Sequence, residues 1–290
     1  MSRRLKHIIL SLLCCLLIHT SVQAQRDHAL LVGISNYPEG NGWSAINGAT
    51  DVHILEKVLK GKGFEVTTLI DEAATYDRII EELARHVKGA QTGDGIYLHF
   101  SCHGQPYEDA DGDEADGWDE AIVPYDAPVI YQSGKYEGEK HLTDDKLNEY
   151  LNALRQKTGK TGYVITVIDA CHAGTSYRGD DDAPVRGTSR GFSSQGRLYR
   201  PLKLEKENTY HIANEPGLSP ITILEACRPY QQNREIKEDG HYVGALSWYV
   251  SRQISQAENW RNSFWIKKVE QAMNGDIRLT QQNLVIETSH

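Results

Sequence analysis

Apolar and β-branched residues dominate five stretches of strand length, at residues 28–34, 65–70, 95–101, 163–169 and 219–227. Several of these runs are hydrophobic at nearly every position, which is typical of strands covered on both faces of a sheet. Apolar residues recur at helical spacing over residues 49–60, 76–88, 144–155, 243–254 and 260–273. The order of the two patterns predicts an α/β fold with a mostly parallel central sheet flanked by helices.

The first residues have the pattern of an export signal. Arg3, Arg4 and Lys6 precede an apolar run over residues 8–18, and small residues follow before Gln25. The run is too short to span a bilayer, so it predicts a cleaved signal peptide over residues 1–24. We therefore expect a mature domain over residues 25–290, periplasmic or secreted, with no membrane span.

Charge and cysteine content limit which class of protein this chain can be. The formal net charge of -9 argues against a general nucleic-acid binder, because such proteins neutralise phosphates with clustered Lys and Arg. Basic peptides fit this charge better. Two of the five cysteines lie in the predicted leader, which leaves Cys102, Cys171 and Cys227. An odd number in an exported chain leaves at least one thiol unpaired, so a disulfide framework does not explain them.

Reactive side chains follow two of the predicted strands. The run "IYLHFSCHG" ends in His103 and Gly104, and "VITVIDACHAG" continues past Asp169 to Cys171. Functional groups in open parallel sheets gather beyond the carboxyl ends of the strands. If the two strands are neighbours, His103 can take the proton of the Cys171 thiol, and the thiolate can attack an acyl carbon. The backbone N–H groups of Gly104 and Cys171 would bind the oxyanion.

Other readings of these residues stay open. A buried Cys is often only a small apolar residue, and a His at a strand end often only caps it. His172 is a second candidate base, although strand alternation directs its side chain away from that of Cys171. A zinc site of Cys102, His103, Cys171 and His172 lacks the usual ligand spacing. A Cys102–Cys171 disulfide would silence the dyad reversibly, but alternation places Cys102 and His103 on opposite faces.

Several motifs, in order, resemble those of metacaspases. "HFSCHG" and "DACHAG" resemble the His-Gly and Asp-x-Cys-His-Ser-Gly segments of that family. "INGATDVHILEKVL", "DGDEADGWDEAIVPYDA" and "LTDDKLNEYL" are similar to other metacaspase segments, and the resemblance runs from about residue 28 to 254. Cys102 and Ala173 stand where metacaspases usually have Gly and Ser, and the animal-caspase segment Gln-Ala-Cys-x-Gly is absent.

The resemblance implies a caspase-like three-layer sandwich and a cysteine endopeptidase with His103 as base and Cys171 as nucleophile. Its substrates would be peptides or proteins. The alternative is an inactive caspase-like module that binds a peptide or a partner without cutting it.

Two aspartates are candidates for the substrate pocket. Asp169 lies two residues before Cys171 on the same strand, so both side chains share one side. Asp51 matches the position from which metacaspases supply a second pocket acid. Two carboxylates predict cleavage after Arg or Lys, because a buried cation must be paired. The structural alternatives are that Asp51 starts its helix and that Asp169 anchors a loop.

Acidic residues concentrate at 108–120 and again at Asp144 and Asp145. The first cluster has partial EF-hand spacing, but Glu114 occupies the position where that loop needs glycine. The resemblance implies instead that Asp119, Asp144 and Asp145 share an activating Ca²⁺. The structural alternative is that acids at a helix start only complement the helix dipole. We expect no cofactor for the chemistry itself.

A polar span over residues 174–216 follows the candidate nucleophile and is far longer than the usual loop of ~4 to 6 residues. It carries five arginines, Arg178, Arg186, Arg190, Arg197 and Arg200. A segment tethered beside an active cysteine is present at a high effective concentration. We therefore expect self-cleavage after an arginine in this span, with an ordinary disordered insert as the alternative.

Overall fold

The computed structural model describes residues 25–109, 112, 114, 116–172, 183–200 and 208–289. The predicted signal peptide and Arg178 therefore lie outside the described residues. Within the described part, none of the helices has the length and apolar character needed to cross a membrane.

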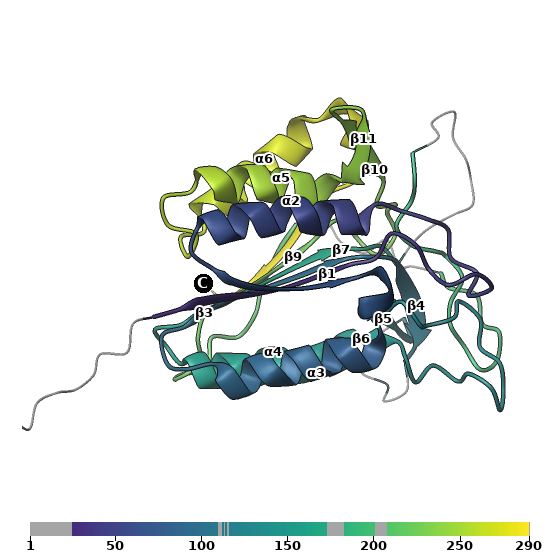
Figure 1. Cartoon of the computed structure of the whole chain (residues 1–290). Helices are drawn as coiled ribbons and strands as arrows, with labels where there is room; N and C mark the ends of the chain where they lie inside the picture. Colours follow the sequence, from purple (N-terminus) through teal and green to yellow (C-terminus); the bar gives the residue numbers. More distant parts are fainter. Residues whose placement is uncertain are drawn as a thin grey trace, which may run out of the picture.

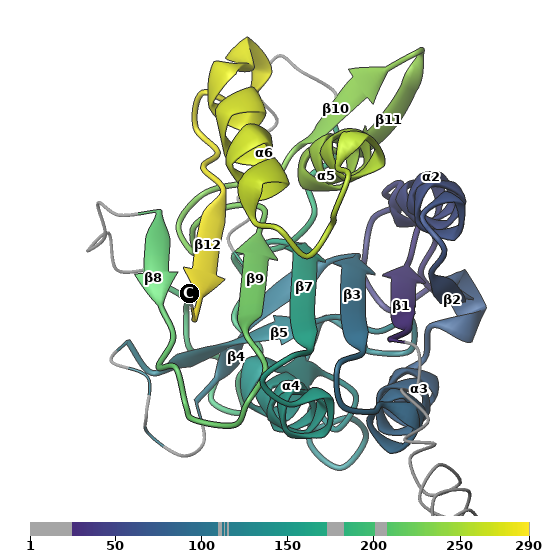
Figure 2. The same cartoon turned by 90° about the vertical axis from the view of Figure 1, so that its left-hand side faces the viewer.

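Seven strands form the central sheet, in the order β2-β1-β3-β7-β9-β12-β8 (Figure 2). Their bounds are β1 Asp27–Gly33, β2 Glu65–Ile70, β3 Gly95–Ser101, β7 Tyr163–Asp169, β8 Thr209–His211, β9 Ile221–Glu225 and β12 Val285–Thr288. The five strands from β2 to β9 run parallel, and β12 runs antiparallel to β9. These five parallel strands are the five that the hydrophobic runs predict.

Helices cover both faces of this sheet (Figure 1). On one face lie α2 Gly48–Gly61, α5 Ala245–Gln256 and α6 Phe264–Gly275, and on the other lie α3 Tyr76–Gly89 and α4 Asp144–Thr158. Two 3₁₀ turns, η1 Asp71–Ala73 and η2 Ile277–Leu279, complete the helical elements of the described residues. The prediction of a mostly parallel sheet between two helix layers is confirmed.

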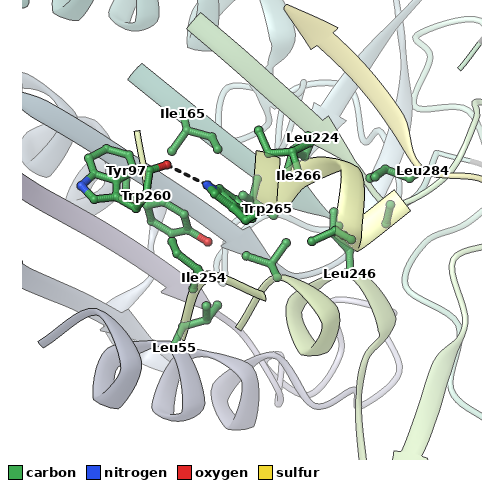
Figure 3. Close-up of a cluster of buried hydrophobic side chains, with 14 of the residues drawn as sticks. Leu55, Tyr97, Ile165, Leu224, Leu246, Ile254, Trp260, Trp265, Ile266 and Leu284 are labelled. Atoms are coloured by element: carbon green, nitrogen blue, oxygen red, sulfur yellow. Dashed lines mark hydrogen bonds between the residues drawn. The ribbon is translucent and has the colours of Figure 1, made fainter. Parts of the chain in front are cut away.

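Local sequence explains where these helices begin and which side they bury. The Thr75 and Thr143 hydroxyls accept from the backbone N–H groups three residues on, which caps α3 and α4. Figure 3 shows the core on the α2, α5 and α6 side, where Leu55 and Trp265 pack with Tyr97 of β3. The Trp265 indole donates to the Trp260 carbonyl at 2.7 Å, so this large side chain is buried without losing its polar partner.

Shorter elements that the sequence patterns did not predict surround the carboxyl ends of the strands. A second, antiparallel sheet contains β4 Gly104–Glu108, β5 Trp118–Ile122 and β6 Leu142–Thr143. A hairpin contains β10 Glu235–Glu238 and β11 His241–Gly244. Since β4 begins directly after His103, the chain turns out of the central sheet at the candidate base.

Candidate active site

The ends of β3 and β7 bring His103 and Cys171 to one edge of the sheet. The two strands are neighbours, and their last residues, Ser101 and Asp169, face each other in the parallel register. His103 and Cys171 each follow two residues later, and each is 1% exposed. The two strands are therefore neighbours, which is the condition on which the candidate dyad depends.

The hydrogen bonds of His103 define its tautomer. Its Nε2 lies 2.9 Å from the carbonyl oxygen of Ser44, which can only accept, so Nε2 carries the hydrogen. Burial lowers the pKa of His103 to about 4, and the bond to Ser44 opposes this only in part. The ring is therefore neutral near pH 7 and has its lone pair on Nδ1. That atom is buried and has no hydrogen-bond partner, and the ring stacks on Trp43 at 4.9 Å between centroids.

The Cys171 thiol is turned toward the next strand end. It donates to the carbonyl oxygen of Gln231 at 2.9 Å, and the Cys227 thiol donates to the same oxygen at 3.5 Å. Cys171 and Cys227 share one small buried cluster. Cys102 belongs instead to the core under α3 and α4, where burial raises its pKa to about 12. No sequence pattern gave Cys227 a role at this site, although it follows β9 as Cys171 follows the neighbouring β7.

Gly104 lies directly beside Cys171. A Cβ at this position would come within 2.7 Å of the Cys171 carbonyl oxygen and 2.9 Å of the His172 ring, so glycine permits the close approach. The predicted oxyanion-binding residues, Gly104 and Cys171, are therefore adjacent. The Nδ1 atom of His172 lies 3.3 Å from Glu120, and burial lowers the pKa of His172 to about 4.

Arg186 fills the pocket that the sequence assigns to a substrate cation. Its guanidinium is fully buried. Nη2 lies 2.7 Å from Asp51, and Nη1 lies 3.6 Å from Asp169 and donates to Ser101 Oγ at 2.6 Å. A third acid, Glu235, accepts from Nε at 3.0 Å and from Nη2 at 2.8 Å. The structure thus brings Asp51 and Asp169 together as predicted, and it adds Glu235, which no sequence pattern indicated.

Neighbouring donors hold the pocket acids in place. The Gly244 N–H donates to Asp51, while Ser247 donates to Asp169 through both N–H and Oγ, at 2.7 and 2.6 Å. Burial opposes ionisation of Asp169, but the guanidinium and the bonds from Asn233 and Ser247 outweigh it and lower its pKa. For Asp51 burial prevails and raises the pKa to about 6, although the guanidinium opposes this shift.

The backbone around Arg186 is extended and paired. The Arg186 N–H donates to the Asn233 carbonyl at 3.0 Å, and the Glu235 N–H donates to the Pro184 carbonyl at 3.0 Å. Residues 184–186 thus lie antiparallel to residues 233–235, as Val185 and Arg234 also form a bridge. The described part of the polar span after residue 183 is ordered and contributes buried side chains, so the alternative of an ordinary disordered insert is wrong for this part.

Gly187 continues this strand to the candidate nucleophile. It forms bridges with both Gly104 and Cys171. A Cβ at residue 187 would collide with the Cys171 carbonyl group, so only glycine fits here. The Arg186 side chain therefore lies in the acidic pocket, and the peptide bond that follows it joins Arg186 to a residue in contact with Cys171.

Two of the three predicted calcium ligands border a cavity of about 380 Å³. Asp119 and Asp144 line it together with Glu120 and Glu225, whereas Asp145 does not. Burial and neighbouring carboxylates, Glu225 first, raise the pKa of Glu120 well above its usual value. Burial, and then Asp145, raises the pKa of Asp144 to about 6, and its Oδ1 is buried without a hydrogen-bond partner.

This crowding of acids suits a cation, but the arrangement is not a closed metal site. Among the described residues, no three His, Cys, Asp or Glu side chains are grouped closely enough to hold a metal ion. That holds for the calcium ligands predicted from the sequence, and equally for the four residues of the zinc alternative. A calcium ion would require the cavity acids to move closer together.

Comparison with known proteins assigns the chain to a family. Residues 26–284 match the family model described as Caspase domain. The chain belongs to the caspase-domain family. It is 32% identical to Metacaspase-1 of Mycosarcoma maydis over 82% of this chain and 64% of that protein. It is 25% identical to Metacaspase-1B of Aspergillus fumigatus, over 83% of this chain and 64% of the relative. The metacaspase-like resemblance is confirmed, and the chain spans less than two thirds of the length of these two relatives.

Solved structures confirm the caspase-like fold. Protein GSU0716 from Geobacter sulfurreducens superimposes with a TM-score of 0.60 at 22% identity, covering 91% of this chain and 93% of that chain. Caspase-1 from Spodoptera frugiperda superimposes with a TM-score of 0.55 at 14% identity, covering 93% and 90%. At these identities the likeness concerns the fold alone.

Proposed function

We propose that this caspase-domain protein is a cysteine endopeptidase that hydrolyses peptide bonds after Arg or Lys. The observation that carries the proposal is Arg186, whose buried cation pairs with Asp51, Asp169 and Glu235 while the next residue abuts Cys171. A pocket that accepts one arginine in this way would accept a basic side chain of a substrate. An acidic side chain would be repelled by the same carboxylates.

The side chains at the two strand ends would divide the chemistry between them. His103 Nδ1 is unprotonated and takes the proton of the Cys171 thiol. The thiolate attacks the carbonyl carbon of the basic residue, and the N–H groups of Gly104 and Cys171 bind the oxyanion. His103 then protonates the leaving amine, and water hydrolyses the thioester. The thiol now donates to Gln231, so it must rotate toward His103 for this reaction.

The enzyme would also process itself. Residues 184–187 occupy the place of a substrate, with Arg186 in the pocket. The other described arginines of the span do not compete for this role. Arg190, Arg197 and Arg200 are exposed, and Arg197 lies over the Trp118 ring at the surface. Until this segment is cut or displaced, it would exclude other substrates.

Calcium activation and export complete the proposal. A calcium ion held by Asp119, Asp144 and Asp145 would relieve repulsion in the acidic cavity, which His172 links to the active site. The signal peptide stays a prediction from the charged and apolar residues of the leader.

An inactive module that binds peptides is the second candidate. The observation that favours it is the orientation of the Cys171 thiol, which hydrogen-bonds a backbone carbonyl instead of facing an acyl group. Such a module would hold residues 184–187, or a partner peptide, in the groove without cutting.

Fluorogenic peptides that differ only in Arg, Lys or Asp before the reporter group test the proposal. The wild-type protein should cut the Arg and Lys peptides and spare the Asp peptide. Cys171→Ala and His103→Ala should each abolish hydrolysis to the same extent, because the two residues act as a unit. Hydrolysis that survives in Cys171→Ala, or a preference for Asp, would overturn the assignment. Binding of the Arg peptide without any hydrolysis would favour the inactive module.

A further inference from the structure

Glu235 makes a contact with Arg186 that a lysine could not reproduce. One oxygen, Oε1, accepts from both Nε and Nη2 of the guanidinium, at 3.0 and 2.8 Å. Asp51 and Asp169 approach only the terminal nitrogens. A lysine side chain has a methylene group where arginine has Nε, so Oε1 would lose the Nε–H donor and keep the backbone N–H of Asn47.

The structure holds Glu235 ready for this contact. Asn47, at the start of α2, donates to it through its backbone N–H at 2.7 Å and through Nδ2 at 2.5 Å. Glu235 also begins β10, and its partner in the hairpin register is Gly244, whose N–H donates to Asp51. The carboxylate is 2% exposed, so water does not compensate for a missing donor.

Glu235 also links recognition of the side chain to recognition of the backbone. Its N–H donates to the Pro184 carbonyl, two residues before Arg186. A peptide that pairs with residues 233–235 therefore places its own basic residue beside the Glu235 carboxylate. Backbone pairing thus fixes the position of the basic residue, and the Glu235 carboxylate then contacts its cation.

We propose that Glu235 is a specificity residue that makes the acidic pocket prefer arginine over lysine. The inference rests on the proposed peptidase function and deepens it. Asp51 and Asp169 would attract either cation by charge, whereas Glu235 accepts a hydrogen bond from the Nε–H that arginine has and lysine lacks. Glu235 contacts the cation in the pocket, so we expect it to act on substrate selection and not on the chemical step.

Matched Arg and Lys peptides test this inference in trans. The protein should carry Arg186→Ala, so that its own segment loses its anchor in the pocket and a peptide can displace it. We expect kcat/KM to favour Arg over Lys by about tenfold or more, the effect of one charge-assisted hydrogen bond left unmade. Glu235→Gln should lower the value for the Arg peptide and bring the two peptides within about threefold of each other.

Two controls separate specificity from general damage. Glu238→Gln changes a glutamate of the same hairpin that pairs with Arg278 at the surface, and it should leave the Arg-to-Lys ratio unchanged. Asp51→Asn should lower kcat/KM for both peptides. An Arg-to-Lys ratio that stays the same in Glu235→Gln would overturn the inference.

A stability cycle tests the same contact without any hydrolysis. In the Cys171→Ala background, Arg186→Lys should lower Tm, because Glu235 loses the Nε–H. The same substitution should cost less than half as much when Glu235 is Gln, since the two changes are coupled. Equal losses of Tm in both backgrounds would refute the role of Glu235. If wild-type protein cuts neither peptide, the proposed function fails, and this cycle still decides the inference.

Discussion

Gly187 abuts Cys171 so closely that any side chain at residue 187 would collide with the Cys171 carbonyl group. The preceding side chain, Arg186, is buried among three carboxylates. A cation in the acidic pocket, followed by a residue in contact with Cys171, is the arrangement expected of an intramolecular substrate. The fold therefore presents one bond of its own chain, Arg186–Gly187, to its candidate active site.

We expect the purified protein to cut itself at this bond and to yield a fragment that begins at Gly187. Mass spectrometry and N-terminal sequencing would identify it. Arg186→Ala should slow the cut by at least about 100-fold, since removing one partner of a buried ion pair costs about 3–5 kcal/mol. Arg190→Ala, which changes an exposed arginine of the same segment, should leave the rate unchanged. Equally efficient cleavage in Cys171→Ala would mean that another protease is responsible.

The strand ends were predictable from sequence because they depend on local pattern. Two continuous apolar runs end before His103 and Cys171, and a parallel sheet brings such ends together. Asp169 follows from strand alternation, whereas Asp51 was assigned only through the metacaspase resemblance. The partners that complete the site were not predictable in this way. Glu235 contacts Arg186, 49 residues away in the sequence, and it begins a short hairpin that no hydrophobic periodicity predicts.

The pH dependence of cleavage should reflect the titration of Asp51 in the pocket and not that of the base, His103. Asp51 faces Arg186, Asp169 and Glu235, and burial raises its pKa to about 6. Below that pH it gains a proton, so the pocket loses a negative charge. His103 stays neutral down to about pH 4, because burial lowers its pKa. We expect the rate on Arg peptides to fall as pH drops through about 6.

Asp51→Asn tests the origin of this acid limb. The variant should be slower at pH 7.5, and its remaining activity should stay flat through pH 6 and fall only nearer pH 4. A pH–rate profile with saturating peptide would show this, since it reports the enzyme–substrate complex. An unchanged limb near pH 6 in the variant would assign it to a different group.

Oxidation should link Cys171 to Cys227 and not to Cys102. Cys171 and Cys227 donate to the same carbonyl oxygen, of Gln231, and the neighbouring Cys171 thiol is the main cause that raises the pKa of Cys227. With hydrogen peroxide, Cys171 would form a sulfenic acid and water. Cys227 would then displace a second water to give the disulfide. Both thiols are oxidised and one peroxide is reduced.

Peroxide should therefore inactivate the protein, and dithiothreitol should restore it. Cys227→Ser should make the loss irreversible under excess peroxide, because the sulfenic acid then oxidises further. Cys102→Ser should behave like the wild type, since Cys102 lies in a different part of the core. Peptide mapping without reduction would identify the bridge, and a bridge that contains Cys102 would contradict the expectation.

The acidic cavity predicts that calcium raises Tm by an amount that depends on pH. Burial, and then Asp145, raises the pKa of Asp144 to about 6, so Asp144 destabilises the fold as pH rises from about 4 through 6. A bound cation favours the ionised carboxylate and removes this penalty. We therefore expect calcium to raise Tm at pH 7.5 by several degrees and to have little effect at pH 5.

Asp144→Asn distinguishes this effect from helix capping, since Asp144 also begins α4. It should abolish most of the calcium-dependent rise in Tm and in peptidase activity. Asp77→Asn is the matched control, because Asp77 lies in the first turn of α3 and away from the cavity. If Asp144 only complements its helix dipole, both variants should lower Tm alike, with or without calcium. Activity and Tm that are unchanged by excess EGTA and by added calcium would refute calcium activation.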